Sequence, residues 1–101
     1  MAFTLTSRSI SLHDTILSAE CRTRDGKWKI SYLDLNQYLS NRNGSFKLHG
    51  TNYFHTAESV SLDGHTLRAS LRRIDGEYGE ALLDLTLCVD NVDGTLRFKK
   101  P

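Results

Sequence analysis

The chain has 101 residues, of which 39% are hydrophobic and 25% are charged, and its formal net charge is +1. No apolar stretch approaches the roughly 20 residues of a membrane helix, and residues 1–7 have neither the basic start nor the apolar centre of a signal peptide. We therefore expect one domain with no membrane partner and no secretion signal. A charge this close to zero gives no long-range field, so no nucleic-acid partner is expected either.

An internal repeat with an offset of 50 residues organises the whole sequence. Comparing residues 4–48 with residues 54–98 without a gap gives 14 identities in 45 pairs. The identities fall on apolar and turn positions, so the repeats, about 3–50 and 53–100, should share strand registers and turns. Half of the chain, about 50 residues, is marginal for a separate core. We therefore expect a single domain spanning residues 1–101.

Within the first repeat, apolar residues alternate with polar ones in three runs, which places their side chains on one face of a strand. The runs are Ile10 and Leu12; Leu17, Ala19 and Cys21; and Trp28, Ile30 and Tyr32. Each run predicts a half-buried strand. Trp28 alternates with Ile30 and is matched by Tyr78 in the second repeat, so we expect it to lie in the core.

Turn signals follow in the same order in both repeats. Asp25-Gly26 and Asp75-Gly76 lie between apolar runs, where Asp-Gly predicts a hairpin. Residues 33–39 and 83–89 break the alternation and predict short helical or 3₁₀ turns. Two further turns precede the last strand of each repeat: Asn41-Arg42-Asn43-Gly44 before residues 45–48, and Asn91-Val92-Asp93-Gly94 before residues 95–98.

The two cysteines, Cys21 and Cys88, lie far apart and have no neighbouring ligand pattern for a zinc or redox site. We expect buried, unpaired thiols, which are easiest to maintain in a reducing compartment such as the cytoplasm. The histidines, His13, His49, His55 and His65, lack metal-ligand spacing and are expected to be solvated loop residues. No metal and no cofactor are expected.

These motifs together resemble the cyanovirin-N homology family of sugar-binding lectins. The resemblance rests on Cys21 to Gly26, Leu33-Asp34-Leu35-Asn36 and Asn41 to Phe46, and on the echo of the last two in Leu83-Asp84-Leu85 and Asn91 to Leu96. It implies an all-β fold of two pseudo-domains related by a pseudo-twofold axis, each a triple-stranded sheet plus a β-hairpin, assembled by strand exchange between repeats. It also implies binding of mannose-rich oligosaccharides.

The resemblance implies no disulfide here. The cysteine positions of the best-known family member fall on Ser7, Cys21, Ala57 and Leu71, of which only one is cysteine. Burial and ladder hydrogen bonds must hold the fold instead. Because each repeat completes its core with strands from the other, we expect a monomer that can form a domain-swapped dimer by a change at His49 to Asn52.

Position by position, the resemblance also implies two carbohydrate sites. The half formed by the two termini would use Thr6, Arg22, Thr23, Arg24, Asn91, Val92 and Asp93. The other half would use Asn41, Asn43, Thr51, Asn52, His55, Thr56, Arg72 and Arg73. Amide and carboxylate side chains on rigid turns suit the hydroxyls of a hexose, although Asn and Asp before Gly are also ordinary turn formers.

Two other functions remain open. Arg22, Arg24, Lys27 and Lys29 surround Trp28, a combination that also suits single-stranded nucleic acid. A protein-interaction domain that has lost sugar binding is the other alternative. No Gly-x-Ser-x-Gly, His-Glu-x-x-His or phosphate-binding glycine loop occurs. We therefore expect a non-catalytic carbohydrate-binding module rather than an enzyme.

Overall fold

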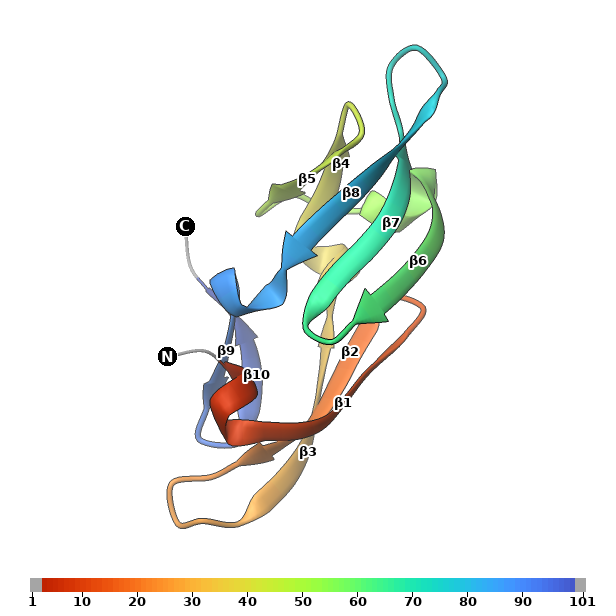
Figure 1. Ribbon diagram of the computed structural model, residues 1–101. Helices are drawn as coiled ribbons and strands as arrows, with labels where there is room; N and C mark the ends of the chain where they lie inside the picture. The colour runs from red at the N-terminus through yellow and green to blue at the C-terminus, as the bar shows by residue number, and fades with distance from the viewer. Residues whose placement is uncertain (1–2, 100–101) are drawn as a thin grey trace.

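The structure, a computed structural model, describes residues 3–99 as an elongated all-β domain of four small antiparallel sheets (Figure 1). The first repeat forms η1 (Phe3–Thr6), β1 (Ser7–His13), β2 (Ile16–Arg22), β3 (Trp28–Asp34), η2 (Leu35–Gln37), β4 (Leu39–Arg42) and β5 (Ser45–Leu48). The second repeat forms η3 (Tyr53–Thr56), β6 (Ala57–Asp63), β7 (Thr66–Arg72), β8 (Tyr78–Asp84), η4 (Leu85–Leu87), β9 (Val89–Val92) and β10 (Thr95–Phe98). Among these described residues, no helix is long and apolar enough to cross a membrane.

The two repeats exchange their hairpins, as the resemblance to cyanovirin-N homologues implied. The β1-β2-β3 sheet packs against β10 of the second repeat, and the β6-β7-β8 sheet packs against β5 of the first. A cross-repeat hydrogen bond runs from the Leu96 amide to the buried Ser31 hydroxyl at 3.0 Å. Each pseudo-domain is therefore a triple-stranded sheet plus a hairpin from the other repeat, and the expected fold class is confirmed.

The repeats also share an irregularity that the sequence pattern did not reveal. The pairing of β1 with β2 is interrupted between Arg8 and Ser11, and that of β6 with β7 between Glu58 and Ser61. Ser9 and Ser59 lie in these interruptions with φ angles of 52° and 54°. The two serines are identical in the repeat, and both lie in the same bulge geometry.

The core face of β3 differs from the expectation. Trp28, Ile30 and Tyr32 are 41%, 60% and 68% exposed, whereas Ser31 and Leu33 are buried. The register explains the difference, because Leu17 on β2 is opposite Leu33 and residues opposite each other share a face. Core burial of Trp28 was therefore a wrong prediction.

The predicted turns are present, and their backbone angles explain their residues. Asn43-Gly44 and Asp93-Gly94 have positive φ at both positions, as two-residue type I′ hairpins require. Asp25-Gly26 belongs to a longer loop, closed by hydrogen bonds between Thr23 and Lys27, in which Gly26 has a φ of 87°. The tight turns that join β1 to β2 and β6 to β7 were not predicted, although Asp63-Gly64 is the same Asp-Gly signal in the second of them.

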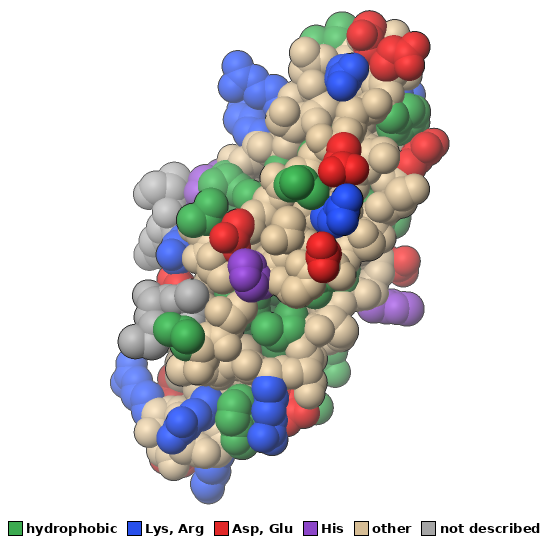
Figure 2. Space-filling view, viewed as in Figure 1, with side chains coloured by type: hydrophobic (Ala, Val, Ile, Leu, Met, Phe, Trp, Pro, Cys, Tyr) green, Lys and Arg blue, Asp and Glu red, His purple; other side chains and the backbone are tan. Residues whose placement is uncertain are grey.

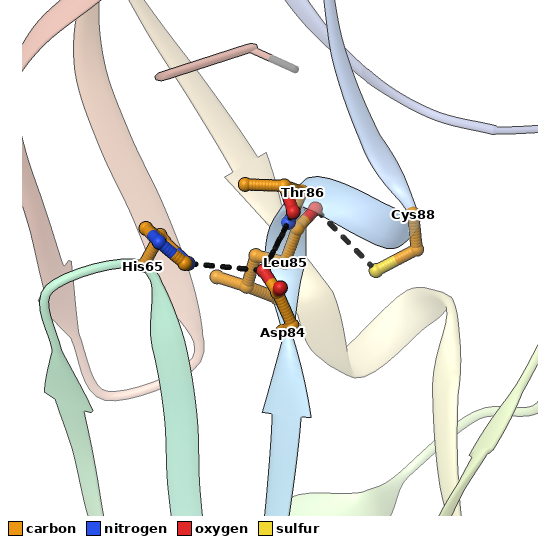
Figure 3. A network of polar contacts seen from close by, with 5 residues as sticks. All are labelled: His65, Asp84, Leu85, Thr86 and Cys88. Atoms are coloured by element: carbon orange, nitrogen blue, oxygen red, sulfur yellow. Dashed lines mark hydrogen bonds and ion pairs between the residues drawn. The ribbon is translucent and has the colours of Figure 1, made fainter. Parts of the chain in front are cut away.

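Aspartates begin both predicted short turns, η2 and η4. Figure 3 shows Asp84 accepting hydrogen bonds from the Thr86 amide at 3.0 Å and from the Thr86 hydroxyl at 2.7 Å. His65 lies in the β6–β7 turn and is exposed, as expected, and its Nδ1 lies 2.9 Å from the same carboxylate, which connects this turn to the end of β8. The Thr86 bonds, with a smaller contribution from His65, hold the pKa of Asp84 below its usual value.

The core is continuous through both repeats. Its largest fully buried side chains form five symmetry-related pairs and one unmatched member: Leu17 with Leu67, Leu35 with Leu85, Phe3 with Tyr53, Leu39 with Val89, Cys21 with Leu71, and Cys88 alone. At the positions where the resemblance places disulfide cysteines, the Ser7 hydroxyl donates to Cys21 Sγ at 3.6 Å, and Ala57 is paired with Leu71. Burial and ladder hydrogen bonds thus occupy the places of the two bridges.

We predict that both thiols stay reduced in the folded protein and that folding requires no disulfide. Cys21 and Cys88 are free and buried, and burial raises the pKa of both, that of Cys88 to about 11. Since the thiolate is the reactive form, alkylation of the native protein at neutral pH should be slow. Alkylation after unfolding without reductant should modify two thiols in a mass spectrum. An intramolecular bridge, or a circular dichroism spectrum lost in reductant, would contradict this prediction.

Candidate functional site

A depression of about 590 Å³ lies where η1, at the start of the described chain, meets the β9–β10 turn. It is lined by Phe3, Thr6, Arg22, Thr23, Arg24, Asn91, Val92 and Asp93. These residues come from η1, the end of β2 with its loop, and the end of β9, which lie side by side in Figure 1. The structure therefore brings together all seven residues that the resemblance implied for this half, and adds Phe3.

Asn91 holds the three segments together. Its side-chain amide donates to the Arg22 carbonyl at 2.9 Å and to the Thr6 hydroxyl at 3.0 Å. Its side-chain carbonyl accepts the Gly94 amide at 2.8 Å, which closes the β9–β10 turn. With its donors and its acceptor engaged, Asn91 positions the walls of the depression rather than offering its amide to a ligand.

Asp93 is the residue of the turn with free hydrogen-bonding capacity. It lies at a φ of 49°, and its Oδ1 accepts the Arg24 backbone amide at 2.9 Å. Its Oδ2 has no protein partner among residues 3–99. One oxygen thus fixes the carboxylate on the wall of the depression, and the other remains available as a charged acceptor.

The second half repeats this framework closely. The Asn41 amide donates to the Thr56 hydroxyl and to the Arg72 carbonyl, both at 2.8 Å, and its carbonyl accepts the Gly44 amide at 2.8 Å. Asn43 Oδ1 accepts the Ile74 amide at 2.9 Å, as Asp93 does for Arg24. The turn that builds the site is therefore duplicated, but it presents an amide here in place of the carboxylate.

Arg73 fills space in the second half that smaller or differently placed groups occupy in the first. Its side chain packs so closely that a β-carbon on Gly44 would lie 2.8 Å from Arg73 Cγ, and one on Gly79 would lie 2.7 Å from Arg73 Nη2. In the termini-formed half, Thr23 and Lys29 pack beneath Gly94 instead. In the second half, Arg73 and Gly79 take the places of Thr23 and Lys29. Side chains therefore support both turns, but the surfaces around the two turns differ.

The remaining residues expected in the second half lie apart from this framework. Asn52 and His55 line a separate depression of about 550 Å³ together with Asn36 and Phe54, neither of which the sequence singled out. The side-chain oxygen of Asn36 accepts a hydrogen bond from the Phe54 backbone amide at 3.1 Å. Thr51 is exposed and lines neither place. The structure thus divides the expected second site between the Asn41 turn and the Asn36 depression.

A third depression, of about 510 Å³, adjoins the first. It shares Thr23, Arg24 and Asp93 with the first depression and is otherwise lined by Asp25, Lys27, Trp28 and Lys29. Among residues 3–99, no group of three or more His, Cys, Asp or Glu side chains could hold a metal ion.

Two repeats that exchange hairpins, so that each pseudo-domain is a triple-stranded sheet plus a hairpin, define a distinct class of all-β fold. The chain belongs to the CVNH family, because the model of the CVNH domain matches residues 3–97. This confirms the resemblance to cyanovirin-N homologues. The members of this family are non-catalytic lectins, so the expectation of a non-enzymatic protein is confirmed by the family.

Solved structures of the same family resemble the chain over nearly its whole length. The chain is 39% identical to GzCVNH from Gibberella zeae, with 95% of each chain covered and a TM-score of 0.88. It is 30% identical to microvirin in a structure with mannobiose, with coverage of 97% of this chain and 98% of that one and a TM-score of 0.85. A MoCVNH3 variant in complex with (N-GlcNAc)4 is 26% identical, with 96% of each chain covered and a TM-score of 0.91. The search of curated proteins found no match.

Proposed function

We propose that this protein is a lectin that binds mannose-containing oligosaccharides through the depression of the termini-formed half. The observation that carries the proposal is the fixed Asp93 carboxylate, which keeps one free oxygen on the wall of a depression built by the Asn91 framework. The mannobiose complex of microvirin, a relative of 30% identity, supports mannose as the sugar.

The groups around this depression match the needs of a hexose. Adjacent sugar hydroxyls each donate and accept, and a charged acceptor on a rigid turn can receive two of their hydrogen bonds. The guanidinium groups of Arg22 and Arg24 supply donors at the rim, and half-exposed Val92 supplies an apolar contact for the sugar ring. Since the framework is formed before the ligand arrives, little conformational entropy is lost on binding.

The termini-formed half is the stronger of the two candidate sites. The turn of the second half carries Asn43 in place of Asp93, and Arg73 packs across Gly44 beside it. The first difference removes the charged acceptor on which the proposal depends, and the second gives the turn a different, cationic neighbour. We therefore assign sugar binding to the first half and a supporting role to the second turn.

Asp93→Asn is expected to weaken mannobiose binding by roughly 10- to 150-fold, which corresponds to the loss of about 1.5–3 kcal/mol for a hydrogen bond to a charged group. The fold should be preserved, because Asn43 makes the same backbone hydrogen bond at the equivalent turn. Isothermal titration calorimetry with mannobiose and with a longer oligomannoside measures the effect.

Asn43→Asp is the matched control, and its affinity should equal that of the wild type. Unchanged binding in Asp93→Asn, together with loss in Asn43→Ala, would move the site to the second half. Titration with a GlcNAc tetramer tests the other sugar found in a relative. Tighter binding of that tetramer than of the oligomannoside would overturn the choice of mannose, and absence of any sugar binding would favour a protein-interaction domain.

A further inference from the structure

The β2–β3 loop carries a concentration of positive charge that its repeat-related loop does not. Residues 22–29 contain four basic side chains and one acidic, a net charge of +3, whereas residues 72–79 contain two of each, a net charge of zero. The basic residues are Arg22, Arg24, Lys27 and Lys29. Figure 2 shows Lys and Arg side chains gathered at the end of the molecule where Figure 1 places this loop. The excess therefore belongs to one half only.

These four cations are not neutralised within the described chain. Among residues 3–99, none of them lies within 4.0 Å of a carboxylate in an ion pair, although Arg8 pairs with Glu20 nearby at 3.1 Å. The one acidic residue of the loop, Asp25, accepts hydrogen bonds from the Thr23 hydroxyl and the Lys27 amide. Its carboxylate thus caps the loop, and the cationic groups keep no carboxylate partner, although Lys29 Nζ donates to the Thr95 hydroxyl at 3.4 Å.

The free charges line a hollow, rather than a convex surface. Arg24, Lys27 and Lys29 surround the depression of about 510 Å³ that adjoins the proposed sugar site, and Thr23, Arg24 and Asp93 form the wall common to both. Trp28 lines the same hollow and is 41% exposed. The Arg8 guanidinium lies over the Trp28 ring, 3.9 Å from its centroid, which holds the ring in place.

We infer that this basic depression binds an anionic group, a phosphate or sulfate ester, on the same glycan whose sugar occupies the adjoining depression. The inference rests on the proposed sugar binding and names its substrate class as an acidic mannose-containing glycan. Guanidinium and ammonium groups that converge on one hollow suit a compact anion. The carboxylate of Asp93 on the shared wall keeps the anion on the side of Lys27 and Lys29, away from the neutral sugar ring.

A single-stranded nucleic acid would use the same charges differently. It would need a long basic track with several stacking platforms, and its affinity would rest on many phosphate contacts. Here the charge is confined to residues 22–29, Trp28 is the aromatic residue of the hollow, and the chain as a whole has a net charge of +1. A short anionic substituent fits this local arrangement better than a polyanion does.

The test compares three forms of one oligomannoside by calorimetry in low salt: neutral, carrying a phosphate monoester, and carrying a sulfate ester. The wild type should bind at least one charged form about tenfold more tightly than the neutral form. The preferred ester identifies the anion, and the preference should disappear in 0.5 M salt, where charges are screened at about 3–5 Å.

Lys27→Gln should reduce this preference and leave the affinity for the neutral oligomannoside unchanged, because Lys27 lines the basic depression but not the first one, and it does not pack beneath the Asp93 turn as Lys29 does. Lys47→Gln replaces an exposed lysine on β5 and is the control, which should retain the full preference. Equal affinity for all three forms, or a preference undiminished in Lys27→Gln, would overturn the inference while leaving the sugar site intact. If the wild type does not bind the neutral oligomannoside, the proposed function is refuted instead. Tighter binding of a single-stranded oligonucleotide than of either ester would overturn the inference in favour of nucleic acid.

Discussion

Asn91→Ala is expected to abolish sugar binding and to lower the free energy of unfolding by about 2–4 kcal/mol. The substitution removes the donors to Thr6 and Arg22 and the acceptor of the Gly94 amide. Each such hydrogen bond contributes about 0.5–1.5 kcal/mol, and the part-buried partners left behind add to the loss. The turn would also lose the contact that maintains positive φ at Asp93, so the carboxylate would no longer be held on the wall.

Asn41→Ala separates the structural effect from the functional one. It breaks the same three kinds of contact in the second half, so the loss of stability in urea unfolding should be similar. Sugar affinity should nevertheless stay at the wild-type value. If Asn91→Ala does not fold, Asn91→Asp keeps the acceptor for Gly94 without the donors and still tests the framework. Retained binding in both Asn91 variants would show that this turn does not form the site.

Much of the fold follows from the sequence because the duplication reports each feature twice. The Asn-x-Asn/Asp-Gly turns were predictable from backbone chemistry, since both central residues tolerate positive φ. The face of β3 was mistaken because Trp28, Ile30 and Tyr32 form a stronger apolar alternation than Ser31 and Leu33. The second repeat indicates the correct core face of β3, because Leu33 is matched by the identical Leu83 and Ser31 is matched by the small, buried Ala81.

The members of the first site could be named from the family pattern, but their roles could not. Whether Asn91 meets a ligand or holds the turn depends on Thr6 and Arg22, which reach it only when the exchanged hairpin closes on the first sheet. The division of the second set has a similar origin. Asn52, which precedes η3, and His55, which lies on η3, come beside Asn36, a contact between elements that no local signal in the sequence predicts.

The hinge between the repeats determines whether hairpins are exchanged within one chain or between two. Gly50 lies in the segment that joins β5 to η3, and a β-carbon there would overlap the Ser40 hydroxyl and lie 2.5 Å from Ser40 Cβ. It would also lie 3.2 Å from the Ser40 backbone nitrogen, which has little room to move because β4 is paired with β5. The monomeric arrangement of residues 49–52 therefore requires glycine at position 50.

Gly50→Ala is expected to favour a domain-swapped dimer, while the wild type should be a monomer at low concentration and exchange only when refolded at high concentration. Straightening of the hinge would take residue 50 away from Ser40 and allow the same interface between two chains. Gly64→Ala is the control, because nothing lies within 4 Å of a β-carbon there and its φ of +63° costs stability without involving the hinge.

Size-exclusion chromatography with light scattering across a refolding concentration series measures the dimer fraction. Because a dimer would carry two copies of the termini-formed site, its avidity for a multivalent glycan should rise by about 10²- to 10⁴-fold. A wild-type dimer that persists at the highest dilution, or a Gly50→Ala protein that stays monomeric throughout, would show that close packing at Gly50 does not control the exchange.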